Sequence, residues 1–219
     1  MSIEIFKRIL SSLILIPVSV IVILDGKIFF EIFLILIFFI SLWELKNITI
    51  NKFLFYLSLS FFLISFLTIY NIRNYNEIDN LNLFNFFFIL TICISTDIGG
   101  YVFGNLFKGP KLTKISPNKT ISGSIGAFIF SFIISYLYLN YIQIFINYSK
   151  PYSFKIFIII FFISAISQIG DIFVSYLKRS SKKKDTGNLI PGHGGLLDRI
   201  DGMLFAFPFS YFLFFYKIL

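Results

Sequence analysis

Ionisable residues are concentrated in one polar segment, residues 175–201, which reads SYLKRSSKKKDTGNLIPGHGGLLDRID. This segment combines lysines, arginines and carboxylates with four glycines and the only histidine, while the sequence on either side is almost entirely apolar. A chain that crosses a membrane gathers so many ionisable groups only where they face water, a ligand or one another. We therefore expect the chemistry of this protein to lie here.

Two aspartates, Asp97 and Asp171, lie inside apolar runs that each lead into a lysine-rich, glycine-containing loop. Each is expected roughly 10 Å below the polar end of its helix, at 1.5 Å rise per residue. Helical spacing places Gly100 and Gly104 on the face of Asp97, which predicts a groove of small residues beside that carboxylate. One buried aspartate is as well explained by a salt bridge or a packing hydrogen bond. Two at matching depth favour a site for a cation and phosphate, because Mg²⁺ uses one or two carboxylates plus substrate phosphates.

Further charged and small residues of the two loops are candidates for the same site. The cations that can balance phosphate charge are Lys119, Lys178, Arg179 and Lys184. The additional carboxylates are Asp185, Asp198 and Asp201. The glycines that allow backbone N–H groups to approach an anion are Gly187, Gly192, Gly194 and Gly195. Helical spacing places Ser175 and Lys178 on the face of Asp171. His193 by itself indicates no more than a structural residue in a tight turn.

The elements that position these residues are predicted to be membrane-spanning helices. Hydrophobic residues make up 57% of the 219, with 32 Phe, and the mean hydropathy is +0.86. The apolar runs of spanning length are Ile9–Leu24, Ile28–Leu42, Phe53–Tyr70, Phe84–Val102, Ile121–Ile146, Phe154–Leu177 and Met203–Leu219. We expect a single all-α polytopic membrane domain with about seven spans: N-terminal spans over about 1–83 and a catalytic region over about 84–219.

The positive residues predict the orientation of the chain. With the N-terminus inside, 14 of the 19 lysines and arginines fall on the inner side. The two long loops, about 103–120 and 178–202, then both face the cytoplasm and are joined by a helical hairpin that turns at 147–153. The connections at 25–27 and 46–52 are expected to be too short to build a site. The first run lacks a small-residue cleavage pattern, so we expect a retained helix and not a signal peptide.

Composition excludes several other classes of protein. Nucleic acid is not expected as a partner, because the chain offers neither a soluble basic domain nor an aromatic reading surface. The single cysteine, Cys93, excludes an intrachain disulfide. One cysteine and one histidine also exclude an ordinary zinc site made of thiolates and imidazoles.

The segment 175–201 resembles the signature of the phosphatidate cytidylyltransferases, also called CDP-diacylglycerol synthases. The matching residues are Ser175, Lys178-Arg179, Lys184-Asp185, Gly187, Pro191, His193-Gly194-Gly195 and Asp198-Arg199-Ile200-Asp201. Upstream matches to that family are Asp97, Tyr101 and Gly104, the run Ser116-Pro117-Asn118-Lys119-Thr120, and Gly170-Asp171. The specific matches thus extend from about residue 97 to residue 201, while the first ninety residues match only in being hydrophobic.

This resemblance implies transfer of a cytidylyl group from CTP to phosphatidate, giving CDP-diacylglycerol and diphosphate. It implies Mg²⁺ as the cofactor, and our hypothesis is that Asp171 and Asp198 bind it. The residues then expected to bind metal or to orient basic side chains are Asp97, Asp185 and Asp201. Those expected to hold phosphates are Lys178, Arg179, Lys184, Arg199 and, from the other loop, Lys119. Ser175 would donate a hydrogen bond to phosphate, and His193, Gly192, Gly194 and Gly195 complete the turn of the signature.

The resemblance also sets the expected surroundings of the protein. The expected partners are CTP, phosphatidate and the lipid bilayer, in a bacterial inner membrane with the active site facing the cytoplasm, and the sequence allows a homodimer. Two departures from the family pattern are Ser122, where a Glu is usual, and Asn118, where a Lys is usual. The chain is also shorter than typical members, so we expect one or two N-terminal spans to be missing.

Three other functions are compatible with parts of the sequence. A CTP-dependent polyprenol or phytol kinase would release CDP and not diphosphate. A CDP-alcohol phosphatidyltransferase is disfavoured, because its Asp-Gly-x-x-Ala-Arg run is absent from the sequence. An ion-coupled carrier would bind its ion near the middle of the membrane, whereas Asp97 and Asp171 are expected near the inner face, beside a basic loop rich in glycine.

Overall fold

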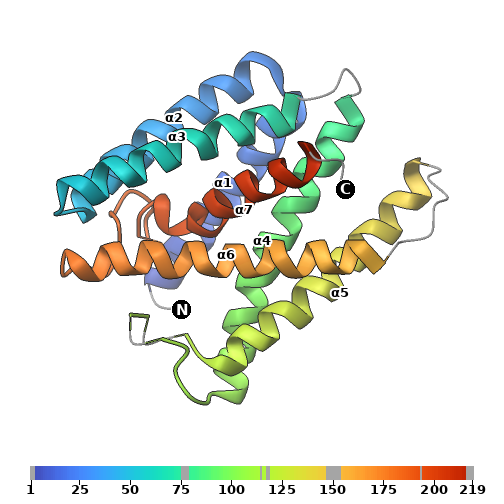
Figure 1. Ribbon diagram of the computed structural model, residues 1–219. Helices are drawn as coiled ribbons and strands as arrows, with labels where there is room; N and C mark the ends of the chain where they lie inside the picture. The colour runs from blue at the N-terminus through green and yellow to red at the C-terminus, as the bar shows by residue number, and fades with distance from the viewer. Residues whose placement is uncertain are drawn as a thin grey trace. The chain divides into compact units, whose positions relative to one another are not determined.

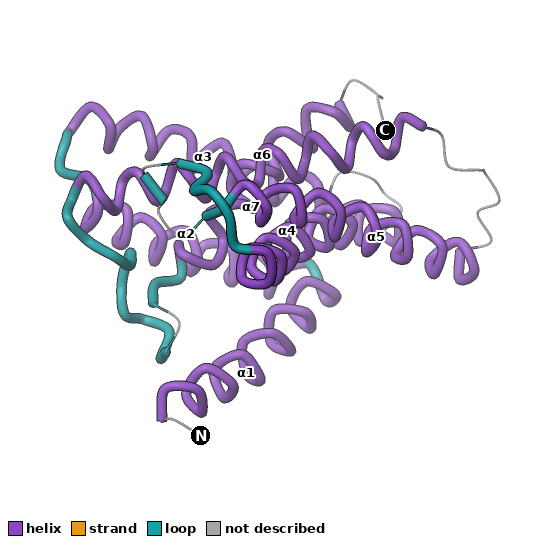
Figure 2. Tube along the Cα trace, turned by 90° about the horizontal axis from the view of Figure 1, so that it is seen from below, coloured by secondary structure: helices purple, strands orange, loops and turns teal. Residues whose placement is uncertain are grey.

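The computed structural model describes residues 3–74, 79–113, 115–116, 119–146, 154–192 and 194–215. Their regular structure is helical, and Figures 1 and 2 show how the helices follow one another. The helices are α1 (Ile3–Asp25), α2 (Lys27–Ile48), α3 (Lys52–Asn74), α4 (Asp79–Phe107), α5 (Ile121–Ile146), α6 (Phe154–Ser180) and α7 (Leu197–Phe215). Across these ranges there is no strand, only isolated bridges between Lys111 and Thr120 and between Ile190 and Gly194. The expected all-α class is confirmed.

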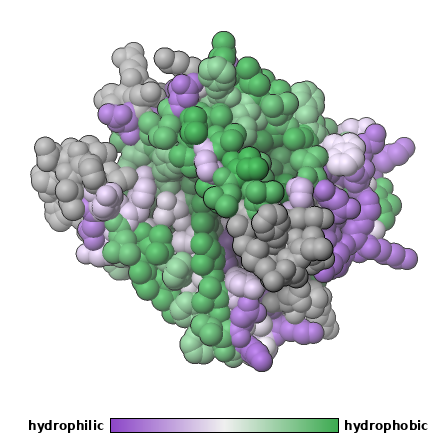
Figure 3. Space-filling model, turned by 180° about the vertical axis from the view of Figure 1, so that it is seen from behind, coloured by the Kyte–Doolittle hydropathy of each residue, from purple (hydrophilic) through white to green (hydrophobic). Residues whose placement is uncertain are grey.

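The helices are those of a polytopic membrane protein. Five of them, α2 to α6, are long and apolar enough to cross a bilayer, and α1 holds a shorter apolar stretch, Leu10–Asp25. Large hydrophobic side chains are exposed along the helices, and hydrophobic residues dominate the face drawn in Figure 3. The first turns of α7 carry Asp198, Arg199 and Asp201. Seven complete crossings therefore remain a prediction for α1 and α7.

Several helices extend beyond the apolar runs that predicted them. Helix α2 continues from the expected end at Leu42 to Ile48, and α4 continues from Val102 to Phe107. Asp97 and Asp171 consequently lie about 15 and about 14 Å from the ends of α4 and α6, and not about 10 Å. The difference arises because polar residues continue a helix past the point where hydropathy falls.

The chain divides into two compact units. Unit 1 comprises residues 1–83 and 176–201, and unit 2 comprises residues 84–175 and 202–219. The division into N-terminal spans over about 1–83 and a catalytic region over about 84–219 remains a prediction. The segment 176–201, which carries most of the signature, packs with the N-terminal helices, so the expected catalytic region contributes to both units.

In unit 1, α1 packs on α2 and α2 packs on α3. The turn between α1 and α2 is fixed by Arg73 of α3, which is fully buried and donates hydrogen bonds to the carbonyls of Ile23 at 2.9 Å and Leu24 at 3.4 Å. Those carbonyls end α1 and lack helical partners. Gly26 has φ +64°, and a Cβ there would lie 2.5 Å from Arg73 Nη2. Only glycine fits both the conformation and the space.

In unit 2, α4 and α5 cross closely through small residues. A Cβ on Gly99 would lie 2.7 Å from the carbonyl oxygen of Gly126, and one on Gly123 would lie 2.7 Å from that of Gly100. Such contacts are typical of membrane helices, which gain van der Waals packing when small residues let their backbones approach. The small residues predicted to form a groove beside Asp97 are the ones on which α5 packs: a Cβ on Gly104 would lie 3.2 Å from Thr120 Oγ1 and 3.6 Å from Gly123 Cα.

In unit 2, hydrogen bonds between side chains join α6 to α4 and to α5. Thr96 of α4 donates to Ser164 of α6 at 2.8 Å, and Ser124 of α5 donates to Gln168 of α6 at 2.6 Å. These bonds lie one to two turns before Asp171 and fix its helix against α4 and α5.

Replacing Gly126 by Ala tests the α4–α5 crossing. The added methyl would lie 2.1 Å from Phe103 Cβ, and overpacking of this kind costs about 1–3 kcal/mol. We expect a lower midpoint of thermal unfolding in detergent. Gly100→Ala is the matched control, because its Cβ would meet its nearest neighbours at 3.8 Å, an ordinary contact. A Gly126→Ala protein as stable as Gly100→Ala would contradict this packing.

Candidate functional site

The polar loop of unit 1 begins at a well-defined helix end. The amide of Lys183 donates to the carbonyl of Lys178 at 2.9 Å and that of Lys182 to the carbonyl of Arg179 at 3.0 Å. Lys182 has φ 58°, so α6 closes in a Schellman motif with lysine in the left-handed position that glycine usually takes. The motif fixes the last turn of α6, which carries Lys178 and Arg179.

The loop then makes a tight turn before α7. The amide of Ile190 donates to the carbonyl of Gly194 at 3.0 Å, and Gly192 and Gly194 have φ 78° and 86°. Both glycines occupy a region of backbone space that other residues rarely adopt. His193, the predicted centre of this turn, lies outside the described residues.

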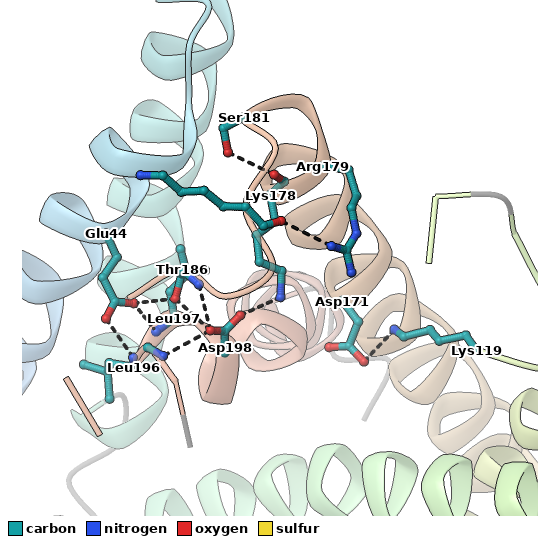
Figure 4. A network of polar contacts seen from close by, with 12 residues as sticks. Glu44, Lys119, Asp171, Lys178, Arg179, Ser181, Thr186, Leu196, Leu197 and Asp198 are labelled. Carbon is teal, nitrogen blue, oxygen red and sulfur yellow. Dashed lines mark hydrogen bonds and ion pairs between the residues drawn. The ribbon is translucent and has the colours of Figure 1, made fainter. Parts of the chain in front are cut away.

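Asp198, in the first turn of α7, is the centre of the polar cluster in unit 1 (Figure 4). Its Oδ1 accepts a hydrogen bond and ion pair from Lys178 Nζ at 2.5 Å, with side chains 9% and 13% exposed, respectively. Its Oδ2 accepts from the amide of Thr186 at 2.9 Å, from the Thr186 hydroxyl at 3.0 Å and from the amide of Gly195 at 3.1 Å. Three of these contacts fall on Oδ2 and one on Oδ1, so both oxygens of the carboxylate are engaged.

The pKa of Asp198 reflects the same contacts. Burial alone would raise this pKa, but the hydrogen bond and charge of Lys178, with the amides of Thr186 and Gly195, outweigh it. The pKa of Asp198 therefore lies below its ordinary value. This carboxylate precedes the seventh apolar run and stays ionised at neutral pH.

A second ion pair lies in unit 2, between Lys119 Nζ and Asp171 Oδ2 at 2.9 Å. The loop after α4 folds back on itself, with the amide of Leu112 donating to the carbonyl of Lys119 at 2.8 Å and that of Ile121 to the carbonyl of Pro110 at 3.0 Å. This return brings Lys119 to α6. The side chains of Lys119 and Asp171 are 29% and 19% exposed, so both can reach a polar ligand.

Ser122, which stands where the family usually has a Glu, takes part in hydrogen bonds at the start of α5. Thr120 caps α5, its hydroxyl accepting from the amide of Gly123 at 3.0 Å. Ser122 lies 3.1 Å from that hydroxyl and donates to the carbonyl of Lys108. The serine thus ties the start of α5 to the end of α4. Asn118, the other departure, lies outside the described residues.

The remaining predicted residues differ in exposure. Ser175 is partly buried and Asp201 is 9% exposed. The exposed ones are Asp97, Arg179, Lys184, Asp185 and Arg199. Within the described ranges, no group of three or more His, Cys, Asp or Glu side chains is arranged to hold a metal ion. The roles given to these residues, to Gly192, Gly194 and Gly195, and to Mg²⁺ remain predictions.

Sequence reasoning missed two residues of this cluster, Glu44 and Thr186. Glu44 accepts hydrogen bonds from the Thr186 hydroxyl at 2.8 Å and from the amides of Leu196 and Leu197 at 2.9 and 2.8 Å. The signal was available, because Glu44 is a carboxylate within α2. It was overlooked because the apolar run was ended at Leu42, and Glu44 also lies before the connection 46–52 that was expected to be too short to build a site.

Comparisons with known proteins identify the family. A sequence profile of the Cytidylyltransferase family matches residues 47–217. The chain is 34% identical over 218 residues to the phosphatidate cytidylyltransferase of Rickettsia felis (strain ATCC VR-1525 / URRWXCal2), covering 96% of this chain and 92% of that protein. It is 39% identical over 141 residues to the phosphatidate cytidylyltransferase of Bacillus subtilis (strain 168), covering 63% of this chain and 51% of that protein.

These matches span nearly all of the Rickettsia protein and about half of the Bacillus protein. The chain belongs to the Cytidylyltransferase family. It is a nucleotidyltransferase built as an all-α integral membrane protein.

Replacing Asp198 by Asn tests the electrostatics of the cluster. Because the pKa of Asp198 is lowered in the folded protein, its ionised form stabilises the fold above the unfolded pKa of about 3.9. That contribution is lost as the pH falls through the lower folded value. We expect the difference in thermal midpoint between wild type and Asp198→Asn to be largest above about pH 4 and to shrink below it.

The matched control is Asp185→Asn, an exposed carboxylate in the same loop, for which the difference should stay small at every pH. Melting curves in detergent between neutral pH and pH 3 provide the measurement. A difference for Asp198→Asn that does not change with pH would contradict the assignment.

Proposed function

We propose that this protein is a phosphatidate cytidylyltransferase that converts CTP and phosphatidate to CDP-diacylglycerol and diphosphate. The observation that carries the proposal is the two Lys–Asp contacts, Lys119–Asp171 and Lys178–Asp198, which join residues inside the range that matches the family. Helix α6 carries one member of each pair, Asp171 and Lys178. These two residues are seven positions apart and therefore lie on one face of the helix. The names of the related proteins support the same reaction.

The chemistry asks little covalent help from the protein. A phosphate oxygen of phosphatidate attacks the α-phosphorus of CTP and forms a new P–O bond, while the bond to the oxygen bridging the β-phosphorus breaks and diphosphate leaves. The attacking group is already an anion, so no general base is required. The protein must instead align the two phosphates and neutralise their charge.

The paired lysines suit this task. Each compensates a partly buried carboxylate, and each can exchange that carboxylate for the oxygens of a polyphosphate without leaving a buried charge unpaired. Arg179, exposed next to Lys178, adds a planar donor suited to phosphate. We propose that entry of the triphosphate draws Lys119 and Lys178 away from Asp171 and Asp198.

The carboxylates freed by this exchange are the proposed ligands of Mg²⁺. Two carboxylates with substrate phosphates match the oxygen-rich donor set that Mg²⁺ prefers, and a cage of three protein carboxylates is not needed. Asp171 is suited to this role because its side chain is partly exposed and its ion pair with Lys119 is made through Oδ2. When bound, the cation supplies charge neutralisation at the phosphates and a fixed geometry for them.

The reaction also accounts for the setting of the loops. CTP is soluble in water and phosphatidate is a lipid, so their reactive groups meet at the headgroup level of a membrane. We propose that the protein lies in a bacterial inner membrane with these loops facing the cytoplasm, because lysines and arginines are concentrated on that side of the predicted topology.

The direct test is an assay of purified protein in mixed micelles with phosphatidate, labelled CTP and Mg²⁺. Labelled CDP-diacylglycerol and released diphosphate are expected in equal amounts. Release of CDP with a phosphorylated polyprenol would show a lipid kinase, and substrate movement across sealed liposomes without CTP consumption would show a carrier.

With CTP added outside, inverted membrane vesicles should form the product and sealed right-side-out vesicles should not.

Two neutralising variants test the ion pair of unit 2. Asp171→Asn and Lys119→Met should each lower kcat at least about 100-fold, as expected for loss of one charge that stabilises the transition state. The double variant should lose less than the product of the two, because the residues act as a pair. The matched controls, Asp25→Asn and Lys111→Met, alter exposed residues of the same types and should keep wild-type activity. Wild-type rates for either site variant, with normal folding, would contradict the proposal.

A further inference from the structure

Glu44 of α2 is a carboxylate held inside unit 1, one turn before its helix ends at Ile48. Its side chain is completely buried and points toward the loop that precedes α7 (Figure 4). Burying such a group is costly unless hydrogen-bond donors surround it. Glu44 has three, because its Oε1 accepts from the amide of Leu196, and its Oε2 accepts from the amide of Leu197 and the Thr186 hydroxyl.

Two of these donors lie at the start of α7: Leu197 is its first residue, and Leu196 immediately precedes it. Amides at the start of a helix have no partner within it, and the helix dipole favours a negative charge at this end. Glu44 therefore caps α7 from a different helix. This contact fixes where α7 begins, and Asp198 is its second residue.

Thr186 connects Glu44 to Asp198 directly. Its hydroxyl lies 2.8 Å from Glu44 Oε2 and 3.0 Å from Asp198 Oδ2, and its amide donates to the same Asp198 oxygen at 2.9 Å. A hydroxyl has only one proton to donate, so the two carboxylates share it. The position of Asp198 depends on Glu44 through this residue as well as through α7.

Two glycines of the signature make room for Glu44. A Cβ on Gly187 would lie 2.8 Å from Glu44 Oε1, and one on Gly195 would lie 2.6 Å from Oε2 and 1.9 Å from Thr186 Oγ1. The amide of Gly195 is itself engaged by Asp198 at 3.1 Å. These glycines let the loop close around a protein carboxylate.

We propose that Glu44 is a positioning residue for the transferase reaction: it holds the loop from Thr186 to Gly195 and the start of α7 so that Asp198 faces Lys178. Its effect on the loop is a property of the fold, while its effect on turnover rests on the proposed function. Glu44 does not contact substrate in this scheme and acts through Thr186 and Asp198.

The effect on the loop is measured by limited proteolysis of Glu44→Gln. An amide places an N–H₂ group against the donors that now bind a carboxylate, so the loop should open and trypsin should cleave faster at Lys182–Lys184. Cleavage in the other loop, at Lys108 and Lys111, is the internal standard. The matched control is Glu31→Gln, also on α2 but 13 residues earlier, where the carboxylate accepts only an exposed hydrogen bond from Tyr70 at 3.2 Å.

The effect on turnover is measured on the same proteins. Misplacing Asp198 should lower kcat of Glu44→Gln at least about tenfold. The KM for CTP should change less than about threefold, because Lys178 and Arg179 are fixed by the end of α6 and not by Glu44. Glu31→Gln should match wild type in cleavage, kcat and KM.

A second pair of variants covers the case in which Glu44→Gln does not fold. Thr186→Val removes the shared hydroxyl with little change in shape and should reproduce both effects, whereas Thr186→Ser retains the hydroxyl and should restore wild-type cleavage and kcat. Equal behaviour of the two Thr186 variants would overturn the proposed connection to Asp198.

The remaining outcomes are equally decisive. Folded Glu44→Gln with wild-type cleavage would overturn the positioning role, whatever its kcat. Faster cleavage with unchanged kcat would overturn the link to turnover. If the wild-type protein forms no CDP-diacylglycerol, the proposed function fails, and the cleavage rates still decide whether Glu44 holds the loop.

Discussion

The ion pair between Lys178 and Asp198, with the three further donors on Asp198, is the interaction on which the polar part of unit 1 depends. An ionised carboxylate in a mostly apolar protein must be compensated, or its desolvation would outweigh the packing around it. The compensation comes from the last turn of α6, the loop at Thr186 and Gly195, and, through Glu44, from α2. One carboxylate thus determines how three parts of the chain converge.

The same constraint appears in unit 2 in a simpler form. Lys119 reaches Asp171 because the loop after α4 turns back along itself, with its return held by backbone hydrogen bonds and the capped start of α5. In both units, a lysine held by local backbone geometry neutralises an aspartate of a long helix. In the proposed reaction, a cation paired in this way would pass to a polyphosphate at little electrostatic cost, because the carboxylate that it leaves would accept a divalent ion. That property links the fold to nucleotidyl transfer.

The sequence predicts much of this architecture. Long apolar runs predict each of the seven helices in the described part of the chain, because hydropathy and length are strong local signals. The residues Lys119, Asp171, Lys178 and Asp198 were also predicted, since ionisable groups in apolar surroundings require a reason. Which lysine pairs with which aspartate was not predicted, because that depends on the return of the loop and the exact end of α6.

Local sequence patterns could not predict several other features. Glu44 was missed because it lies between the last strongly apolar residue of its run and the end of its helix, where hydropathy no longer marks the boundary. The spacing of Gly100 and Gly104 predicts a groove of small residues, but it does not show that α5 packs there, since spacing shows which residues share a face and not what covers that face. The close approach of Gly187 and Gly195 to Glu44 joins positions far apart in the chain, which no local pattern contains.

The exchange of partners by the two lysines is tested most directly by an experimental structure of the protein bound to CTP and Mg²⁺. We predict that Lys119 and Lys178 will lie within hydrogen-bond distance of triphosphate oxygens and will have left Asp171 and Asp198, whose oxygens will face the cation. A structure with the nucleotide bound and both lysine–aspartate pairs intact would contradict this account.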